Sequence, residues 1–208
     1  MTLNTTQMTA LGLSAHIPPG DVHPAVLNGA ELALWRDHDC HVHLWEDRCP
    51  HRGMRLSFGF VRANRLTCLY HGWEFGGDSG CKRIPAHPDL DPPATLCATR
   101  FPVAERFGMI VLNGSPDQDA TWHAVRSIFV PRPLADLRLP EISDTPWRAD
   151  GPFWLGTLGD YRIALARHAV GAAESALHVT TTHPDTDTRL SLARALVRHR
   201  QQFTQETA

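Results

Sequence analysis

Four side chains that can bind metal stand in two short, similar segments of the sequence. The first segment is Cys49-Pro50-His51, and the second, after sixteen further residues, is Cys68-Leu69-Tyr70-His71. Thiolates and imidazoles are ligands of zinc, and also of two-iron clusters in which two histidines replace two cysteines on one iron. The pattern C-x-H-x16-C-x2-H therefore predicts a metal centre held by Cys49, His51, Cys68 and His71.

The spacing of these ligands helps to separate the two kinds of centre. Structural zinc sites usually place paired ligands two to four residues apart, so the single residue between Cys49 and His51 is unusual for them. Both segments repeat the order cysteine then histidine, followed by Arg52-Gly53 in the first and Gly72-Trp73 in the second. The spacing favours a two-iron cluster, and a structural zinc module with an interaction role is the alternative.

The two segments and their flanks resemble a known family. Trp45–Gly53 and Cys68–Trp73 are similar to the Rieske [2Fe–2S] domain of the Rieske non-haem iron oxygenases. These include ring-hydroxylating dioxygenases and demethylating monooxygenases such as vanillate demethylase. The resemblance covers about residues 18–114 and implies a [2Fe–2S] cluster. It also implies that the two cysteines hold an inner iron and the two histidines an outer iron nearer the surface.

Residues 15–113 are predicted to form an antiparallel β domain. Short apolar runs alternate with turn residues every 8 to 12 residues or so, as in all-β domains. Hairpin turns are expected at Asp37–Cys40, at the glycine-rich Gly76–Gly80 and at Glu105–Gly108. The expected fold class is mainly β: a tail over 1–17, then a Rieske-type antiparallel β domain over 18–114.

The composition changes after residue 114. A proline-rich, irregular linker is expected over 115–146, since it contains Pro116, Pro131, Pro133, Pro140 and Pro146. Residues 161–170 and 176–182 are predicted to form a β-hairpin. A helix with one apolar face should then run from Asp187 or Thr188 to about Phe203. Residues 147–208 are thus predicted to be a small α+β extension.

Oxygenases of this family also use a mononuclear Fe(II) held by two histidines and a carboxylate in a larger catalytic domain. Too few residues follow Gly114 for that domain, but His178 and His183, with Glu174 and Asp185 nearby, are a candidate Fe(II) site. If residues 176–182 form a strand, the two histidines point to opposite faces. We therefore expect the mononuclear iron on another chain, and a compact self-contained oxygenase is the alternative.

The remaining thiols and several imidazoles need no metal to explain them. They are Cys40, Cys81, Cys97, His38, His41 and His43. We interpret the cysteines as ordinary buried or turn thiols and the three histidines as polar surface. Arg52 is either a surface charge or a contact to a redox partner.

Length and composition bound the function further. The chain has 208 residues, 42% hydrophobic and 20% charged, with a formal net charge of −2, which describes a globular protein without a polyanion-binding surface. Its apolar runs are far shorter than the roughly 20 residues of a membrane helix, and residues 1–10 lack the features of a secretory signal. We expect a cytoplasmic protein with no membrane or nucleic-acid partner.

These inferences converge on an oxidoreductase component of a Rieske mono- or dioxygenase system. The chain is expected to accept single electrons from a reductase or ferredoxin and to pass them to an oxygenase subunit. No catalytic residue is assigned on the chain itself. The resemblance also implies assembly into homo- or hetero-oligomers.

Overall fold

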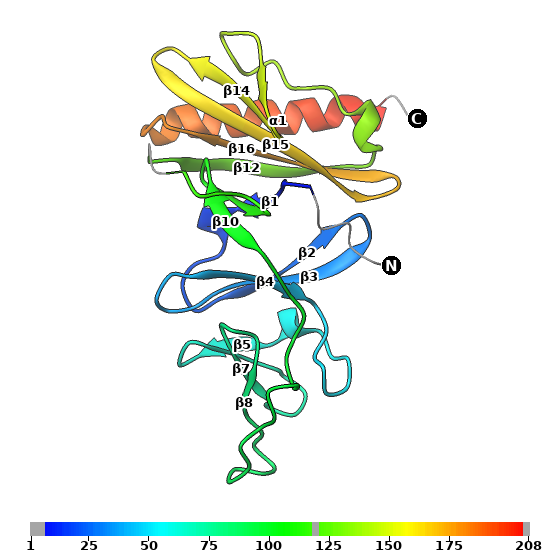
Figure 1. The fold of residues 1–208 in the computed structure, drawn as a ribbon. Coiled ribbons are helices and arrows are strands. Elements are labelled where there is room, and N and C mark those ends of the chain that lie inside the picture. The colour runs from blue at the N-terminus through cyan, green and yellow to red at the C-terminus, as the bar shows by residue number, and fades with distance from the viewer. Residues whose placement is uncertain (1–6, 118–120, 206–208) are drawn as a thin grey trace. The chain divides into compact units, whose positions relative to one another are not determined.

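The computed structural model describes residues 7–117 and 121–205, which fold mainly into antiparallel strands (Figure 1). This confirms the predicted fold class. A single α-helix, α1 (Thr186–Gln205), closes the described chain. Within the described ranges, no helix combines the length and hydrophobicity needed to cross a bilayer. The chain divides into two compact units, which are described separately.

The first unit comprises Ile17–Val26 and Ala30–Val103 and contains both halves of the metal-binding motif. It has two four-stranded sheets, with strand orders β2-β3-β4-β9 and β5-β6-β7-β8. The strands are β2 (Val22–Leu27), β3 (Ala30–Arg36), β4 (Val42–Glu46), β5 (Phe60–Arg62), β6 (Arg65–Thr67), β7 (Glu74–Gly76), β8 (Cys81–Arg83) and β9 (Arg100–Phe101), and a short 3-10 helix, η2, spans Leu56–Phe58.

Two predicted hairpins shape this unit. β3 and β4 pair around the turn at Asp37–Cys40, and β7 and β8 pair around the glycine-rich turn, as expected. Trp35 and Trp45, from β3 and β4, lie in one buried core with Cys49 and Cys68. The motif cysteines are therefore part of the core of the first unit, and their positions depend on its packing.

The second unit comprises the described parts of residues 3–16, 27–29 and 104–208. A three-stranded sheet has the order β1-β11-β10, and a five-stranded sheet has the order β12-β16-β15-β14-β13. Besides α1, its elements are β1 (Thr9–Leu13), η1 (Ser14–His16), β10 (Val103–Arg106), β11 (Met109–Leu112), β12 (His123–Val130), η3 (Leu134–Asp136), β13 (Arg148–Asp150), β14 (Phe153–Leu158), β15 (Tyr161–Gly171) and β16 (Glu174–Thr181).

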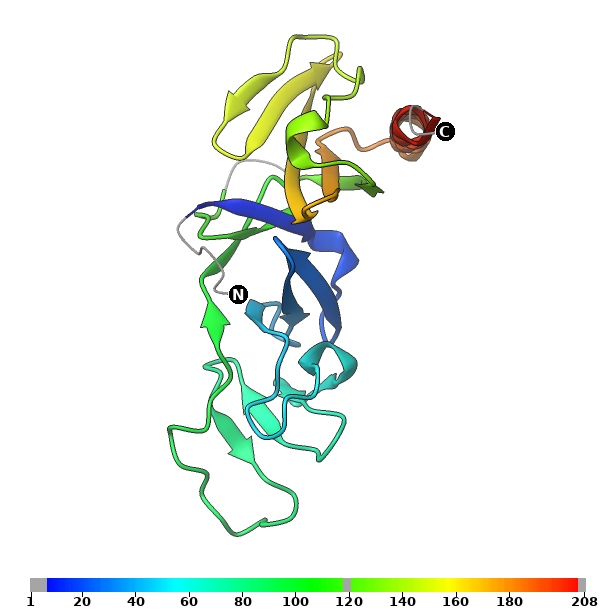
Figure 2. The same ribbon diagram turned by 90° about the vertical axis from the view of Figure 1, so that its right-hand side faces the viewer.

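The five-stranded sheet buries both of its faces, because successive side chains of a strand point to opposite sides. On one face, Leu177 and Val179 pack with Leu196 of α1; Figure 2 shows this helix end-on beside the sheet. On the other face, Ala164 and Ala166 pack with residues of the three-stranded sheet. The strands that cover each other therefore come from distant parts of the sequence.

The expectation of an irregular linker over 115–146 is wrong in its centre. β12 lies there as an end strand of the five-stranded sheet and pairs with β16, with Ile128 opposite Leu177. The prolines bracket this strand instead of interrupting it, since Pro116 precedes it and Pro131 follows it directly. The extension over 147–208 is likewise larger than a hairpin and helix, because β13 and β14 add a second hairpin to the same sheet.

The expected N-terminal tail over 1–17 also contains a strand. β1 pairs with β11, with Thr9 opposite Leu112 and Leu13 opposite Met109. The predicted β10–β11 hairpin is present, but it belongs mostly to the second unit, although it was expected within the 18–114 domain. The predicted helix is confirmed with an earlier start. The Asp185 carboxylate accepts a 2.7 Å hydrogen bond from the Thr188 N–H and caps its first turn.

Candidate cluster-binding site

The two motif segments form two loops with the same backbone pattern. The Cys49 N–H donates to the Met54 carbonyl at 2.8 Å, and the Gly53 N–H donates back to the Cys49 carbonyl at 2.8 Å. In the second loop, the Cys68 N–H donates to the Trp73 carbonyl at 2.9 Å, and the Gly72 N–H donates back to the Cys68 carbonyl at 3.0 Å.

A glycine is needed at the same place in both loops. Gly53 has a φ of +73° and Gly72 a φ of +68°, a conformation that other residues rarely adopt. The first loop follows β4 and the second follows β6. Local sequence therefore builds the same turn twice and places a cysteine at the start of each.

The four predicted ligands come together in the structure. Cys49 and Cys68 are 3% and 2% exposed, and their thiols share a hydrogen bond. The His51 and His71 rings lie 4.6 Å apart between centroids, with His51 half-buried and His71 exposed. The sulfur ligands thus lie inside the unit and the nitrogen ligands lie toward the surface.

The electrostatics of these ligands favour a bound metal centre. Burial raises the pKa of the Cys49 thiol to about 11, despite backbone N–H groups of His51 and Arg52 that hydrogen-bond to its sulfur. A thiolate in this place therefore needs a positive partner such as iron, since metal binding releases the thiol proton. The pKa of His51 is lowered, first by burial and then by the charges of His71 and Arg52. A neutral imidazole is the form that binds metal.

Aromatic rings hold both histidines. Trp73 stacks on His51 with 4.3 Å between ring centroids and 6° between planes, and Tyr70 lies 3.8 Å from His71. Behind them, Trp73 contacts Phe75 and Phe75 contacts Trp45. The sequence motif does not reveal this stacking, which limits how the His51 ring can turn.

The donor set, two thiols and two imidazoles, fits a two-iron cluster. Among the described residues, no three His, Cys, Asp or Glu side chains gather as they would around one ion. A Rieske cluster needs only two protein ligands on each iron, and its own bridging sulfides separate the two pairs. The paired inner thiols and paired outer imidazoles match that division.

The second candidate metal site is not assembled. In β16, His178 Nδ1 is 2.7 Å from Ser127 Oγ, and its Nε2 is 3.3 Å from His168 Nδ1. His183 instead contacts the Tyr161 ring and accepts a hydrogen bond from the Asp185 N–H. The two histidines thus have separate partners, as expected for residues five apart around the end of a strand.

The polar cluster near the β3–β4 turn has an acceptor that sequence reasoning missed. Asp37 is 6% exposed, and its Oδ2 lies 3.2 Å from His41 Nδ1 and 3.1 Å from His43 Nε2. His41 is the exposed member, while His43 stacks on Trp35 at 4.0 Å. Of the cysteines outside the motif, Cys81 is buried, and Cys40 and Cys97 are exposed.

The buried imidazole of His178 is expected to make the second unit sensitive to acid. Its pKa lies well below the usual value, first because it is fully buried and then because of the His168 and His16 charges. Below about pH 6.5 the unfolded chain binds a proton that the folded chain excludes. Stability from this group is therefore complete above that pH and declines as the pH falls toward the folded pKa.

We expect His178→Asn to flatten this pH dependence. The free energy of unfolding of the wild-type protein should fall as the pH drops from about 6.5 to about 5, by roughly 1.4 kcal/mol for each pH unit. The His178→Asn variant should be less stable than the wild-type protein at neutral pH, but its free energy of unfolding should fall less on acidification. Urea unfolding at several pH values measures this, with His123→Asn of the same unit as control. An unchanged slope in His178→Asn would refute the assignment.

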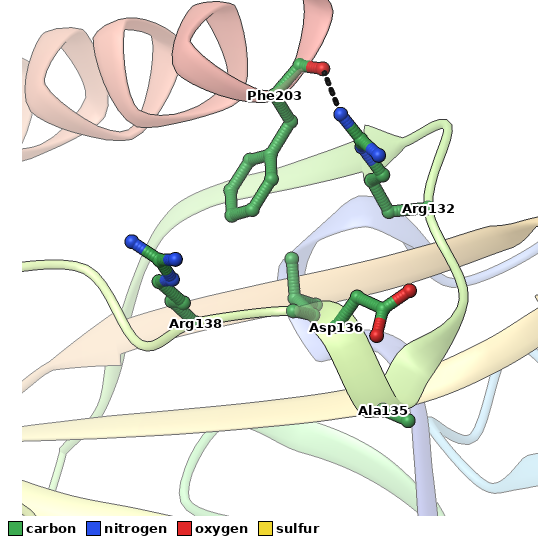
Figure 3. A pocket seen from close by; sticks show the side chains of 6 residues that line it. Arg132, Ala135, Asp136, Arg138 and Phe203 are labelled. Carbon is green, nitrogen blue, oxygen red and sulfur yellow. Dashed lines mark hydrogen bonds between the residues drawn. The ribbon is translucent and has the colours of Figure 1, made fainter. Parts of the chain in front are cut away.

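A cavity in the second unit lies apart from all predicted ligands. It has a volume of about 320 Å³ and lies beside η3 and the C-terminal end of α1 (Figure 3). Arg132 Nη2 donates to the Phe203 carbonyl at 3.3 Å at its edge. Arg138 and Asp136 also line it, and no thiol or imidazole does. The cavity therefore supplies no ligand for iron.

Comparisons with known proteins agree with the geometry of the site. Residues 7–99 match the family model of the Rieske [2Fe-2S] domain. The chain is 42% identical over 109 residues to the oxidoreductase NdmD of Pseudomonas putida, covering 52% of this chain and 18% of that protein. It is 34% identical over 148 residues to the chloroplastic pheophorbide a oxygenase of Arabidopsis thaliana, covering 67% of this chain and 27% of that protein. The chain thus spans less than a third of these relatives.

Solved structures share the fold. The NdmA QL mutant of Pseudomonas putida CBB5 with theobromine superposes with a TM-score of 0.72 at 15% identity, covering 96% of this chain and 81% of that chain. Dicamba monooxygenase superposes with a TM-score of 0.65 at 21% identity, covering 89% of this chain and 79% of that chain.

The family match defines an iron–sulfur domain, and the four candidate ligands lie within it. Residues 7–99 belong to the Rieske [2Fe–2S] domain family, and the relatives of the chain are Rieske non-haem iron oxygenases and their components. The resemblance noted in the sequence is confirmed, and the cofactor is a [2Fe–2S] cluster.

Proposed function

We propose that this chain is the electron-transfer component of a non-haem iron oxygenase system. It accepts single electrons from a reductase or ferredoxin and passes them to a mononuclear iron on another chain. When bound, a [2Fe–2S] cluster supplies storage for one electron at a time. The observation that carries the proposal is the division of the ligands, with Cys49 and Cys68 buried and His51 and His71 facing outward.

The side chains of the site suit this role. The buried cysteines fix the inner end of the site in the core, so it changes little when a partner binds. The Trp73 ring, stacked on His51, and the Tyr70 ring, tilted against His71, hold the two histidines in place. Electron transfer between proteins is fastest where the gap is shortest, so a partner is expected to approach from the histidine side.

One observation supports placing the electron acceptor on another chain. His178 and His183 have separate hydrogen-bond and ring partners, so they form no pair that faces a common iron. We therefore propose that oxygen and substrate meet on a partner subunit.

Electron counting tests the proposed function. Protein reduced without oxygen and freed of reductant should transfer one electron per chain to oxidised cytochrome c, followed by its absorbance. When both proteins are titrated with iron, the wild-type protein and His178→Ala should each bind two irons per chain. A third tightly bound iron that His178→Ala removes would contradict the proposal and favour a self-contained oxygenase.

A further inference from the structure

We propose that the groove between α1 and β12 binds an acidic amphipathic helix of a partner protein. The groove lies where α1 packs against β12, the end strand of the five-stranded sheet (Figure 1). Both elements belong to the second unit, so binding there does not depend on the proposed electron transfer.

The shape of the groove suits a helix. It has a volume of about 450 Å³. On the α1 side it is lined by Leu190, Ala193, Arg194, Val197, Arg198 and Gln201. These residues recur every three or four positions and therefore form one face of α1. From Leu190 to Gln201 this face extends over about 16 Å, which matches about three turns of a second helix.

The centre of the groove is apolar. Leu190, Ala193 and Val197 line it, and Leu190 is 49% exposed, whereas its neighbour Leu192 is buried. Apolar residues at this spacing match the apolar anchors of an amphipathic helix that lies along the groove. The partner segment should therefore present large apolar side chains on one face.

The rim of the groove is positive. Arg126 of β12 and Arg194 and Arg198 of α1 are exposed and line it, and no carboxylate does. Within the described ranges, none of the three arginines forms an ion pair. Arg194 and Arg198 are one helical turn apart, a distance at which like charges repel each other. An acidic partner would relieve this repulsion.

The helix dipole does not account for these arginines. It favours positive charge in the last turn of a helix, and the last turn of α1 has no basic residue. The sequence of α1 contains four arginines and one carboxylate, Asp187, which stands in the first turn. The excess of positive charge therefore lies along the middle of the helix, beside the groove.

The combination of apolar centre and positive rim favours a protein helix over other anionic partners. Carboxylates three or four residues apart on a second helix can reach successive arginines while its apolar face covers Leu190. A membrane-surface helix inserts its apolar face into lipid, but the apolar face of α1, with Leu196 and Phe203, is buried in the core of the unit. A second copy of this chain would bring the same arginines together, which is repulsive.

Fluorescence anisotropy of the holoprotein with a labelled synthetic peptide tests the groove. The probe is a helical peptide of about 18 residues with leucines on one face and glutamates on the other. At about 20 mM salt, the Kd of Arg194→Glu should be about tenfold weaker than that of Arg200→Glu. Arg200 is an exposed arginine of α1 that does not line the groove, so the two variants have the same net charge. The difference should shrink at about 300 mM salt, where charges are screened.

Two further variants separate binding from folding. Arg126→Glu, on the β12 side of the groove, should weaken binding as Arg194→Glu does, although it leaves α1 unchanged. Leu190→Ser should weaken binding several-fold at both salt concentrations, because it removes an apolar contact. Each changed side chain is exposed, so the circular dichroism spectra should match that of the wild-type protein.

Other results would overturn the proposal. Equal Kd values for Arg194→Glu and Arg200→Glu would do so, as would equally tight binding of a peptide with glutamines in place of the glutamates. Cosedimentation with phosphatidylglycerol vesicles that Arg194→Glu abolishes, without a difference in peptide binding, would assign the groove to a membrane surface. A wild-type dimer in sedimentation that Arg194→Glu dissociates would assign it to a second copy.

Discussion

Cys68→Ser is expected to abolish cluster binding. The Cys68 thiol is 2% exposed beside Cys49, and a serine hydroxyl there is a much weaker ligand for iron. Retained iron and sulfide should fall by at least about tenfold, since even changes to residues behind metal ligands often cost that much. Because Cys49 and Cys68 belong to the core of the first unit, its thermal unfolding should also shift to lower temperature.

The matched control for this variant is Cys97→Ser. Cys97 is an exposed free cysteine of the same unit and lies outside the ligand set. Iron analysis and visible absorption after anaerobic reconstitution should match the wild-type protein. Equal iron and sulfide contents in Cys68→Ser and Cys97→Ser would show that Cys68 does not bind the cluster.

His71→Cys is expected to lower the reduction potential without emptying the site. A thiolate in place of the neutral imidazole adds negative charge, which disfavours the added electron. Rieske centres lie at roughly −150 to +300 mV, and all-cysteine centres of plant-type ferredoxins lie near −400 mV. Because only one of the two histidines is exchanged, the potential should fall by about half of that gap, roughly 100 mV or more, which a redox titration followed by visible absorption measures.

His87→Cys is the control for that change. His87 is an exposed residue of the first unit, and its backbone N–H bonds to the Ile84 carbonyl outside the two ligand loops. The reduction potential and the visible spectrum of the His87→Cys protein should equal those of the wild-type protein. A His71→Cys protein with the same potential and spectrum as this control would show that His71 does not ligate the cluster.

The grouping of the four candidate ligands could be predicted because the information that places them is local. In each loop, cysteine, histidine and glycine lie within a few residues, and two backbone hydrogen bonds close the turn. The hairpin turns at Asp37–Cys40 and Gly76–Gly80 were predictable for the same reason. Spacing within a loop is fixed by covalent geometry, so it can be read without knowledge of the rest of the fold.

What the sequence did not reveal depends on contacts between distant segments. β1 pairs with β11, and β12 pairs with β16. The residues around β1 and β12 in the sequence do not indicate which strand each of them pairs with. The imidazole pair of His168 and His178 forms across two strands, so its burial follows from strand register. The prolines predicted an irregular segment, but they lie outside β12, so the strand between them was not predicted.

The most direct test of the cluster is an iron and sulfide count on anaerobically prepared protein, combined with low-temperature electron paramagnetic resonance after dithionite reduction. The buried thiol pair and outer imidazole pair predict two irons and two acid-labile sulfides per chain, with one unpaired electron in the reduced form. Protein that contains zinc, lacks inorganic sulfide and gives no signal on reduction would contradict the account.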